Sequence, residues 1–352
     1  MESLDSFSGR TPRAWKDHGV FEGHVGARKR VSPASDSETP LDESDAMTAG
    51  AYIEQLAHAN PRKREEAIQR LSELGWEDTD GALGALLPRL RDPHPSVRAK
   101  AADALGASAD GGAAEPLMTA LDDENREVRF RAAFALEQLE PPVDIEVRIR
   151  AWDAVVDRDN QNVYALCNLS LAHRESGNRE VAVETAYQAI ELHPEHFYPY
   201  LLVAHLYAEK GEREAAVRYY KCAIRCNPEH APTYYELAEL HRLEADYESA
   251  VERYQQALDV DADHSESYFG LGFCYNRMER YDDAIRAYTA CLELSPGHYV
   301  AHNNLGMAHR YRGSYEEAME CFKHALELSP DYAAAQLNLG DTFVVVSATR
   351  DD

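Results

Sequence analysis

A repeat of 34 residues fills much of the C-terminal half of this 352-residue chain and constrains its fold more than any other feature. Cut at 163, 197, 231, 265 and 299, the sequence gives five consecutive segments of equal length. Each segment has the apolar spacing of amphipathic helices. A fixed period of this length is typical of stacked helical hairpins, in which each unit packs on its neighbours. We therefore expect this part of the chain to form an all-α solenoid.

Small and aromatic residues recur at fixed positions of these segments. Position 8 is small, position 20 is alanine, position 24 is aromatic in four segments, and position 27 is small. Small residues allow two helices to cross closely, and the aromatic ring fills the space beside them. The pattern resembles the tetratricopeptide repeat (TPR), which implies a superhelix of hairpins over residues 163–343. Its units are 163–196, 197–230, 231–264, 265–298 and 299–332, with a partial unit at 333–343.

A second repeat precedes the first. The segment DPHPSVRAKAADAL (92–105) aligns with DENREVRFRAAFAL (123–136) at a shift of 31 residues. Each copy follows a leucine-containing segment, so each unit is interpreted as two amphipathic helices, with Asp92 or Asp123 as the N-cap of the second. The pattern resembles HEAT-like repeats, especially the short class also found in phycobilisome lyases. This resemblance implies an α-solenoid of HEAT-like helical pairs over 49–142.

The remaining segments are assigned from their composition. Residues 1–48 are rich in Ser, Asp, Pro and Glu, which predicts a disordered acidic and polar tail. Residues 143–162 contain one amphipathic segment, which we interpret as a junction helix between the two arrays. Residues 344–352 are assigned to a C-terminal tail.

The chain is strongly acidic, with 62 acidic and 36 basic residues and a net charge of −26. This charge disfavours nucleic acid and anionic membranes, because phosphate contacts require surplus Lys and Arg. The sequence has no apolar stretch of the ~20 residues that span a bilayer, and no secretory signal. We therefore expect a cytoplasmic protein without a nucleic-acid or membrane partner. The low lysine content also fits a salt-adapted source, although a GC-rich genome would give part of the same bias.

Four histidines share one position of the 34-residue repeat, and these are His196, His230, His264 and His298. Side chains spaced along a solenoid cannot converge on one tetrahedral ion, so we expect them to pack or hydrogen-bond at repeat junctions. The cysteines occupy packing positions, where thiols act as small apolar groups. We predict no catalytic residue, no metal site and no cofactor.

The resemblance to TPR proteins implies that the first helix of each unit lines a concave groove. The positions concerned carry aromatic residues and arginines that the packing pattern does not require, which suits a peptide with apolar anchors and some acidic residues. We therefore expect a non-catalytic scaffold or adaptor that binds a peptide segment or protein partner. The predicted groove residues are Tyr164, Arg174, Tyr198, Leu201, His205, Tyr235, Arg242, Phe269, Phe273, Arg277, Asn303, Met307, Arg310 and Tyr311.

Two alternatives remain open at this stage. The helix at 333–343 has no second helix in its repeat, and an apolar run follows it, so residues 333–346 could mediate self-association. The HEAT-like region could instead form the cleft of a chromophore lyase or another ligand-handling enzyme, although it carries no identifiable attachment chemistry.

Overall fold

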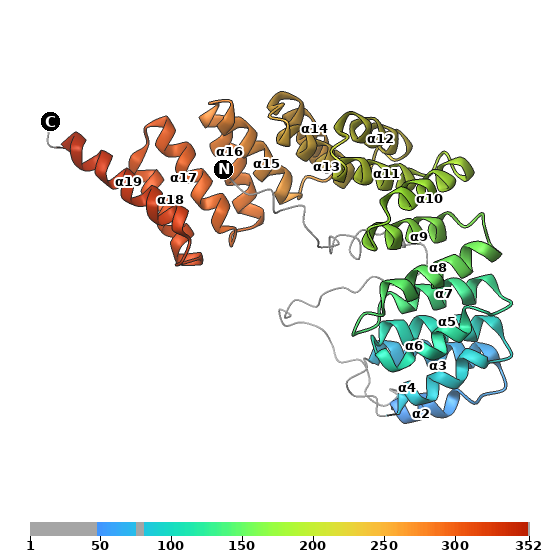
Figure 1. The fold of residues 1–352 in the computed structure, drawn as a ribbon. Coiled ribbons are helices and arrows are strands. Elements are labelled where there is room, and N and C mark those ends of the chain that lie inside the picture. The colour runs from blue at the N-terminus through green and yellow to red at the C-terminus, as the bar shows by residue number, and fades with distance from the viewer. Residues whose placement is uncertain (1–47, 75–80, 351–352) are drawn as a thin grey trace. The chain divides into compact units, whose positions relative to one another are not determined.

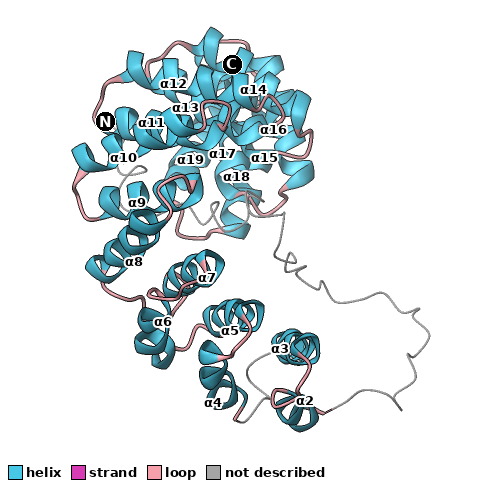
Figure 2. Ribbon diagram, turned by 90° about the vertical axis from the view of Figure 1, so that its right-hand side faces the viewer, coloured by secondary structure: helices cyan, strands magenta, loops and turns pink. Residues whose placement is uncertain are grey.

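The computed structural model describes residues 48–74 and 81–350, and its named elements within these ranges are all helices (Figures 1 and 2). The chain divides into two compact units, one up to Val143 and one from Asp144. In each unit, consecutive helices pack on their neighbours along the chain. The predicted all-α solenoid class is thus confirmed. The acidic tail predicted for 1–48 lies, except for Thr48, outside the described residues.

The first unit consists of short helical pairs around an aliphatic core. Ile68, Leu86, Leu105 and Leu117 are almost completely buried in it. Longer second helices, such as α5 and α7, pack on one another and on the shorter first helices. The elements are α2 (Ala49–Gln55), α3 (Pro61–Leu74), α4 (Ala82–Leu86), η2 (Leu87–Arg91), α5 (Pro95–Ala107), η3 (Gly111–Ala113), α6 (Ala114–Ala120) and α7 (Arg126–Leu136).

The prediction that Asp92 and Asp123 are N-cap residues is wrong. The N-cap residues are His94 for α5 and Asn125 for α7, two positions further along the chain. Asp92 accepts a hydrogen bond from the amide of His94 at 3.0 Å, and Asp123 accepts one from the amide of Asn125 at 2.8 Å. Each aspartate therefore closes the turn before the helix, and its carboxylate also reaches another helix.

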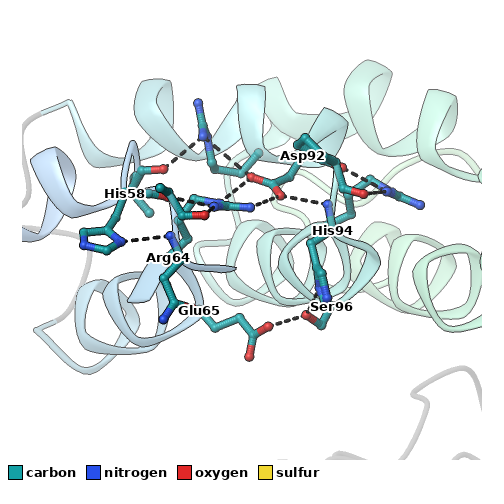
Figure 3. A network of polar contacts seen from close by, with 12 residues as sticks. His58, Arg64, Glu65, Asp92, His94 and Ser96 are labelled. Atoms are coloured by element: carbon teal, nitrogen blue, oxygen red, sulfur yellow. Dashed lines mark hydrogen bonds and ion pairs between the residues drawn. The ribbon is translucent and has the colours of Figure 1, made fainter. Parts of the chain in front are cut away.

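Both aspartates bind an arginine of the preceding second helix (Figure 3 shows the first pair). Arg64 of α3 donates Nε and Nη2 to the two oxygens of Asp92 at 2.8 and 2.6 Å. Arg98 of α5 donates to Asp123 in the same way, at 2.6 and 2.9 Å. Burial opposes ionisation of Asp92, but hydrogen bonds from Arg64 and His94 lower its pKa overall. A bidentate, largely buried ion pair thus links successive HEAT-like repeats.

The second unit begins with one helix and continues as helical hairpins. The two helices of each 34-residue unit pack together, α9 with α10 and so on to α17 with α18. The elements are α8 (Ile145–Arg158), α9 (Val163–Glu175), α10 (Arg179–Leu192), α11 (Phe197–Glu209), α12 (Arg213–Cys226), α13 (Ala231–Leu243), α14 (Tyr247–Val260), α15 (Ser265–Arg277), α16 (Tyr281–Leu294), α17 (Tyr299–Arg312), α18 (Tyr315–Leu328) and α19 (Ala333–Arg350).

Close helix crossings explain the alternation of small and aromatic residues. A Cβ added to Gly272 would lie 2.7 Å from the ring of Tyr288, and one added to Gly306 would lie 2.6 Å from the ring of Phe322. Both rings are fully buried. In the first repeat the small residue is Ser170, whose hydroxyl donates to a backbone carbonyl of α10 at 2.7 Å and so is satisfied in the interior.

The four periodic histidines are the N-cap residues of α11, α13, α15 and α17. Each packs against an aromatic ring on the first helix of its own 34-residue unit, one unit before the helix that it caps. The centroid distances are 5.3 Å for His196 and Tyr164, 4.8 Å for His230 and Phe197, 5.1 Å for His264 and Tyr235, and 4.9 Å for His298 and Phe269. In α15 and α17 the histidine Nδ1 also accepts a backbone amide, at 3.2 and 3.1 Å. The predicted role at repeat junctions is confirmed.

The two helices outside the five hairpins differ in how well they were predicted. α8 lies within the segment 143–162 expected to form a junction helix, and it packs against α9. α19 continues to Arg350, so the prediction that the helix stops near 343 and that a tail follows is wrong for residues 344–350. The valine run forms part of this helix, with Val346 buried and Val344 exposed.

Candidate partner-binding surface

The first helices of the 34-residue units carry the predicted groove residues. Neighbouring first helices contact one another, as α9 does α11 and α15 does α17. We call the predicted set the first-helix surface. Tyr198, Leu201 and Asn303 are buried, whereas Arg277 and Tyr311 are exposed. The partly buried members are Tyr164, Arg174, His205, Tyr235, Arg242, Phe269, Phe273, Met307 and Arg310.

An ion pair and a hydrogen bond connect neighbouring repeats at the N-terminal end of this surface. Arg174 of α9 donates its Nε to Glu209 of α11 at 2.7 Å. His205 of α11 lies with its Nε2 2.6 Å from a carboxylate oxygen of Glu236 on α13. The positive charge expected from Arg174 is therefore already compensated within the chain.

A second compensated group lies in the third repeat. Arg242 donates its Nη2 to Glu239 at 2.7 Å, and the hydroxyl of Tyr254 donates to the same carboxylate. Burial and the neighbouring carboxylate raise the pKa of Tyr254, so this hydroxyl stays protonated and remains a donor. The guanidinium of Arg242 also lies 5.0 Å from the ring centroid of Phe273, on the next first helix.

Arg277 differs from the other arginines of the surface. Its guanidinium lies 5.8 Å from the ring centroid of Tyr247 on α14, and it forms no ion pair with any described residue. The ring of Tyr247 meets that of Phe273 edge to face, with the centroids 6.4 Å apart. By contrast, Arg310 lies 3.9 Å from a carboxylate oxygen of Asp341. The middle of the surface thus presents one exposed cation beside two aromatic rings.

Amide and aromatic groups continue the surface toward the C-terminal end. Asn338 of α19 donates to the side-chain oxygen of Asn303 at 2.9 Å, and Asn303 donates to Asn304 at 3.2 Å. Tyr311 is 55% exposed and stacks on Tyr281, with ring centroids 5.4 Å apart. This end therefore offers an aromatic face together with a fixed amide pair.

Sequence reasoning missed the carboxylates that compensate the surface. Glu209 lies 35 residues after Arg174, and Glu236 lies 31 residues after His205. Residues on adjacent first helices meet when they are one period apart, give or take a helical turn. A glutamate at such a separation from an arginine or a histidine was thus the signal that could have identified both contacts.

The described residues give little indication of other chemistry. No group of three or more His, Cys, Asp or Glu side chains in these ranges is arranged to hold a metal ion. None of the helices that the structure describes is both long enough and apolar enough to cross a membrane.

These observations define a class, the helical repeat proteins that display a surface along stacked helices. The family model for HEAT repeats matches residues 49–137 and 83–172. Models for the tetratricopeptide repeat match 163–196 and 198–230, and also 229–297 and 263–331. The chain is therefore a repeat protein with HEAT repeats in its N-terminal part and tetratricopeptide repeats in its C-terminal part. The narrower likeness to phycobilisome-lyase repeats stays a prediction.

Solved structures similar to this chain include two that are described as tetratricopeptide repeat proteins. YrrB, described as a TPR protein with an unusual peptide-binding site, is 22% identical over 53% of this chain and 97% of its own, with a TM-score of 0.47. MamA is 23% identical over 49% of this chain and 95% of its own, with a TM-score of 0.46. A tetratricopeptide repeat protein from Parabacteroides merdae is 19% identical over 63% of this chain and 87% of its own, with a TM-score of 0.48. No curated protein matches the chain.

Proposed function

We propose that this chain is a non-catalytic cytoplasmic scaffold or adaptor that binds a peptide segment or protein partner along the first-helix surface. Stacked repeats suit this role because each hairpin is held by its neighbours, so a long surface is rigid before the partner arrives. The observation that carries the proposal is the exposed guanidinium of Arg277, which has aromatic neighbours and no carboxylate partner among the described residues.

The contacts of this surface also define the chemistry of the partner. Arg174 and Arg242 are neutralised by Glu209 and Glu239, so they do not attract a strongly acidic segment. A segment with one acidic residue opposite Arg277 and aromatic or aliphatic residues on either side fits better. Such apolar anchors gain most where they remove rings such as Phe273 from water.

The test is a peptide selection against the immobilised full-length chain. Peptides selected from a random library are expected to combine an acidic residue with apolar residues. They should lose about tenfold in affinity for the Arg277→Glu variant, because a charge-assisted contact is replaced by repulsion. The matched control is Arg218→Glu, which changes an exposed arginine on the second helix α12. Equal binding to both variants, or failure to select any peptide, would contradict the proposal.

The alternative of a chromophore lyase or ligand-handling enzyme is not developed further. The helices of the first unit pack around buried aliphatic side chains, including Ile68, Leu86 and Leu136. The observations that point to a ligand lie instead on the second unit, at the first-helix surface.

A further inference from the structure

The last helix, α19, exposes positions that every earlier repeat covers. Position 8 of the repeat is buried in all five complete units, but Gly340, at the same position of α19, is exposed. Leu337 and Phe343 on this helix are 65% and 63% exposed. In the earlier repeats a second helix packs across this face, whereas the described residues include no second helix paired with α19. Among the described residues, Leu337, Gly340 and Phe343 thus leave part of α19 exposed.

Two earlier repeats show which group belongs on such a face. The rings of Tyr288 and Phe322 lie directly over Gly272 and Gly306, within 2.7 Å of where a Cβ would stand. Around Gly340, no described atom lies within 4 Å of an added Cβ. α19 thus offers the same hollow without the ring that fills it.

The same helix carries a ring of the required kind. Phe343 follows Gly340 by three residues, slightly less than one helical turn, so both lie near the same face of α19. When two copies of α19 cross antiparallel about a two-fold axis, Phe343 of each copy faces Gly340 of the other. We propose that this chain forms a symmetric dimer in which each α19 supplies the ring that the other lacks. Such an interface uses the same patch on both copies.

The distribution of charge permits a second copy as the occupant, and the ring and hollow on one helix favour it. The chain has a net charge of −26, which makes two copies repel at long range. Within residues 333–349, however, Asp341 is the only Asp, Glu, Lys or Arg, and the hollow beside Gly340 and Phe343 adds one charged side chain, Lys323 of α18. Val344 is 67% exposed and extends the apolar patch beyond Phe343. A foreign helix would need to bring its own ring, whereas a second copy has both the ring and the hollow.

The strength of the dimer follows from the size of this patch and from the charge. One helix face is small compared with the interfaces of stable dimers, so we expect a dissociation constant in the micromolar range. Added salt screens the repulsion between the acidic copies and therefore strengthens the association. This salt dependence is opposite to that of an interface held by ion pairs.

The experiment is sedimentation of the full-length chain across the micromolar range, in low and high salt. The mass should rise from 39.5 kDa toward twice that value with concentration, and at lower concentrations in high salt. Phe343→Ala should weaken dimerisation about tenfold or more, because the buried ring is the main contact. Leu294→Ser, at an exposed apolar residue of α16, should leave it unchanged.

A swap of the two groups tests the reciprocal geometry. Gly340→Phe alone should also abolish pairing, whereas Gly340→Phe combined with Phe343→Ala exchanges ring and hollow and should restore it. Far-UV circular dichroism confirms that each variant folds. The proposal is overturned if the chain stays monomeric at all concentrations and in both salts, if Phe343→Ala still dimerises normally, or if the swap does not restore pairing. A foreign helix that binds α19 of a monomeric chain would also overturn it. Arg277→Glu should not affect dimerisation, so this test is independent of the peptide selection.

Discussion

At the scale of single residues, the turn inside each tetratricopeptide hairpin requires left-handed backbone at position 15. Glycine occupies this position in three repeats, at 177, 211 and 313, with φ between 79° and 90°. Ala245 and Glu279 occupy it in the other two, with φ of 59° and 60°. A side chain in this conformation costs about 1 kcal/mol, so these two hairpins carry backbone strain.

Replacing the strained residues with glycine should therefore stabilise the protein. We expect Glu279→Gly and Ala245→Gly each to raise the free energy of unfolding by about 0.5 kcal/mol, since the greater freedom of unfolded glycine offsets part of the relief. The reverse change, Gly313→Ala, should lower it. Thermal unfolding followed by circular dichroism measures all three. Ala245→Gly is the control for charge, and a stabilisation seen only with Glu279→Gly would mean that charge, not strain, is responsible.

The periodic histidines show what sequence can predict at this scale. Their position and their role at repeat junctions followed from the 34-residue period. Their partners did not, because His230 meets Phe197 at position 1 of a repeat while His298 meets Phe269 at position 5. The period fixes the backbone position of each histidine. The ring that the histidine contacts depends on side-chain rotamers and on which positions of its unit are aromatic.

At the scale of elements, the HEAT-repeat aspartates show where a local rule was overruled. An aspartate before a helix is a reasonable N-cap by sequence, and this was the role assigned to Asp92. In the structure the carboxylate of Asp92 pairs with Arg64 instead. A buried guanidinium without a counter-charge costs more free energy than a helix start without an aspartate cap. The recurrence of Arg98 and Asp123 at similar spacing was a signal for this pairing, but it becomes clear only when the two helices are placed side by side.

The pair of Arg64 and Asp92 should therefore stabilise the first unit strongly. Asp92→Ala leaves a buried guanidinium without its partner, which we expect to cost about 3 kcal/mol. The control is Glu73→Ala, which removes the exposed ion pair with Arg70 on the same α3 and should cost less than about 1 kcal/mol. Native-state hydrogen exchange of the slowest α3 and α5 amides measures both. Similar losses for the two variants would contradict a structural role for the buried pair.

This stabilisation should also depend on pH. The folded state lowers the pKa of Asp92 below its ordinary value of 3.8, so the folded protein binds this proton less readily than the unfolded chain. The ionised carboxylate of Asp92 therefore contributes its full stabilisation above pH 3.8. This stabilisation is lost as the pH falls through the lower pKa of the folded state. In acid, the difference between the parent chain and Asp92→Ala should accordingly become smaller.

At the scale of the whole molecule, the fold class and the five hairpins followed directly from the repeat, whereas the character of the surface did not. The order of the first and second helices could be predicted from the 34-residue period, because each hairpin packs only on its neighbours along the chain. Charge compensation was not predicted, because a separation of about one period allows Arg174 and Glu209 to meet, but only the structure shows that they pair. What remains exposed after this cancellation, chiefly Arg277 with its aromatic neighbours, is what we propose a partner recognises.

The most direct test of this account is hydrogen exchange of the full-length chain with and without a peptide selected against it. The account predicts that bound peptide slows exchange in the first helices α13, α15 and α17, around Arg277. The second helices α14 and α16 and the HEAT repeats should show little change. Slowed exchange confined to the HEAT repeats or to the second helices would contradict partner binding along the first-helix surface.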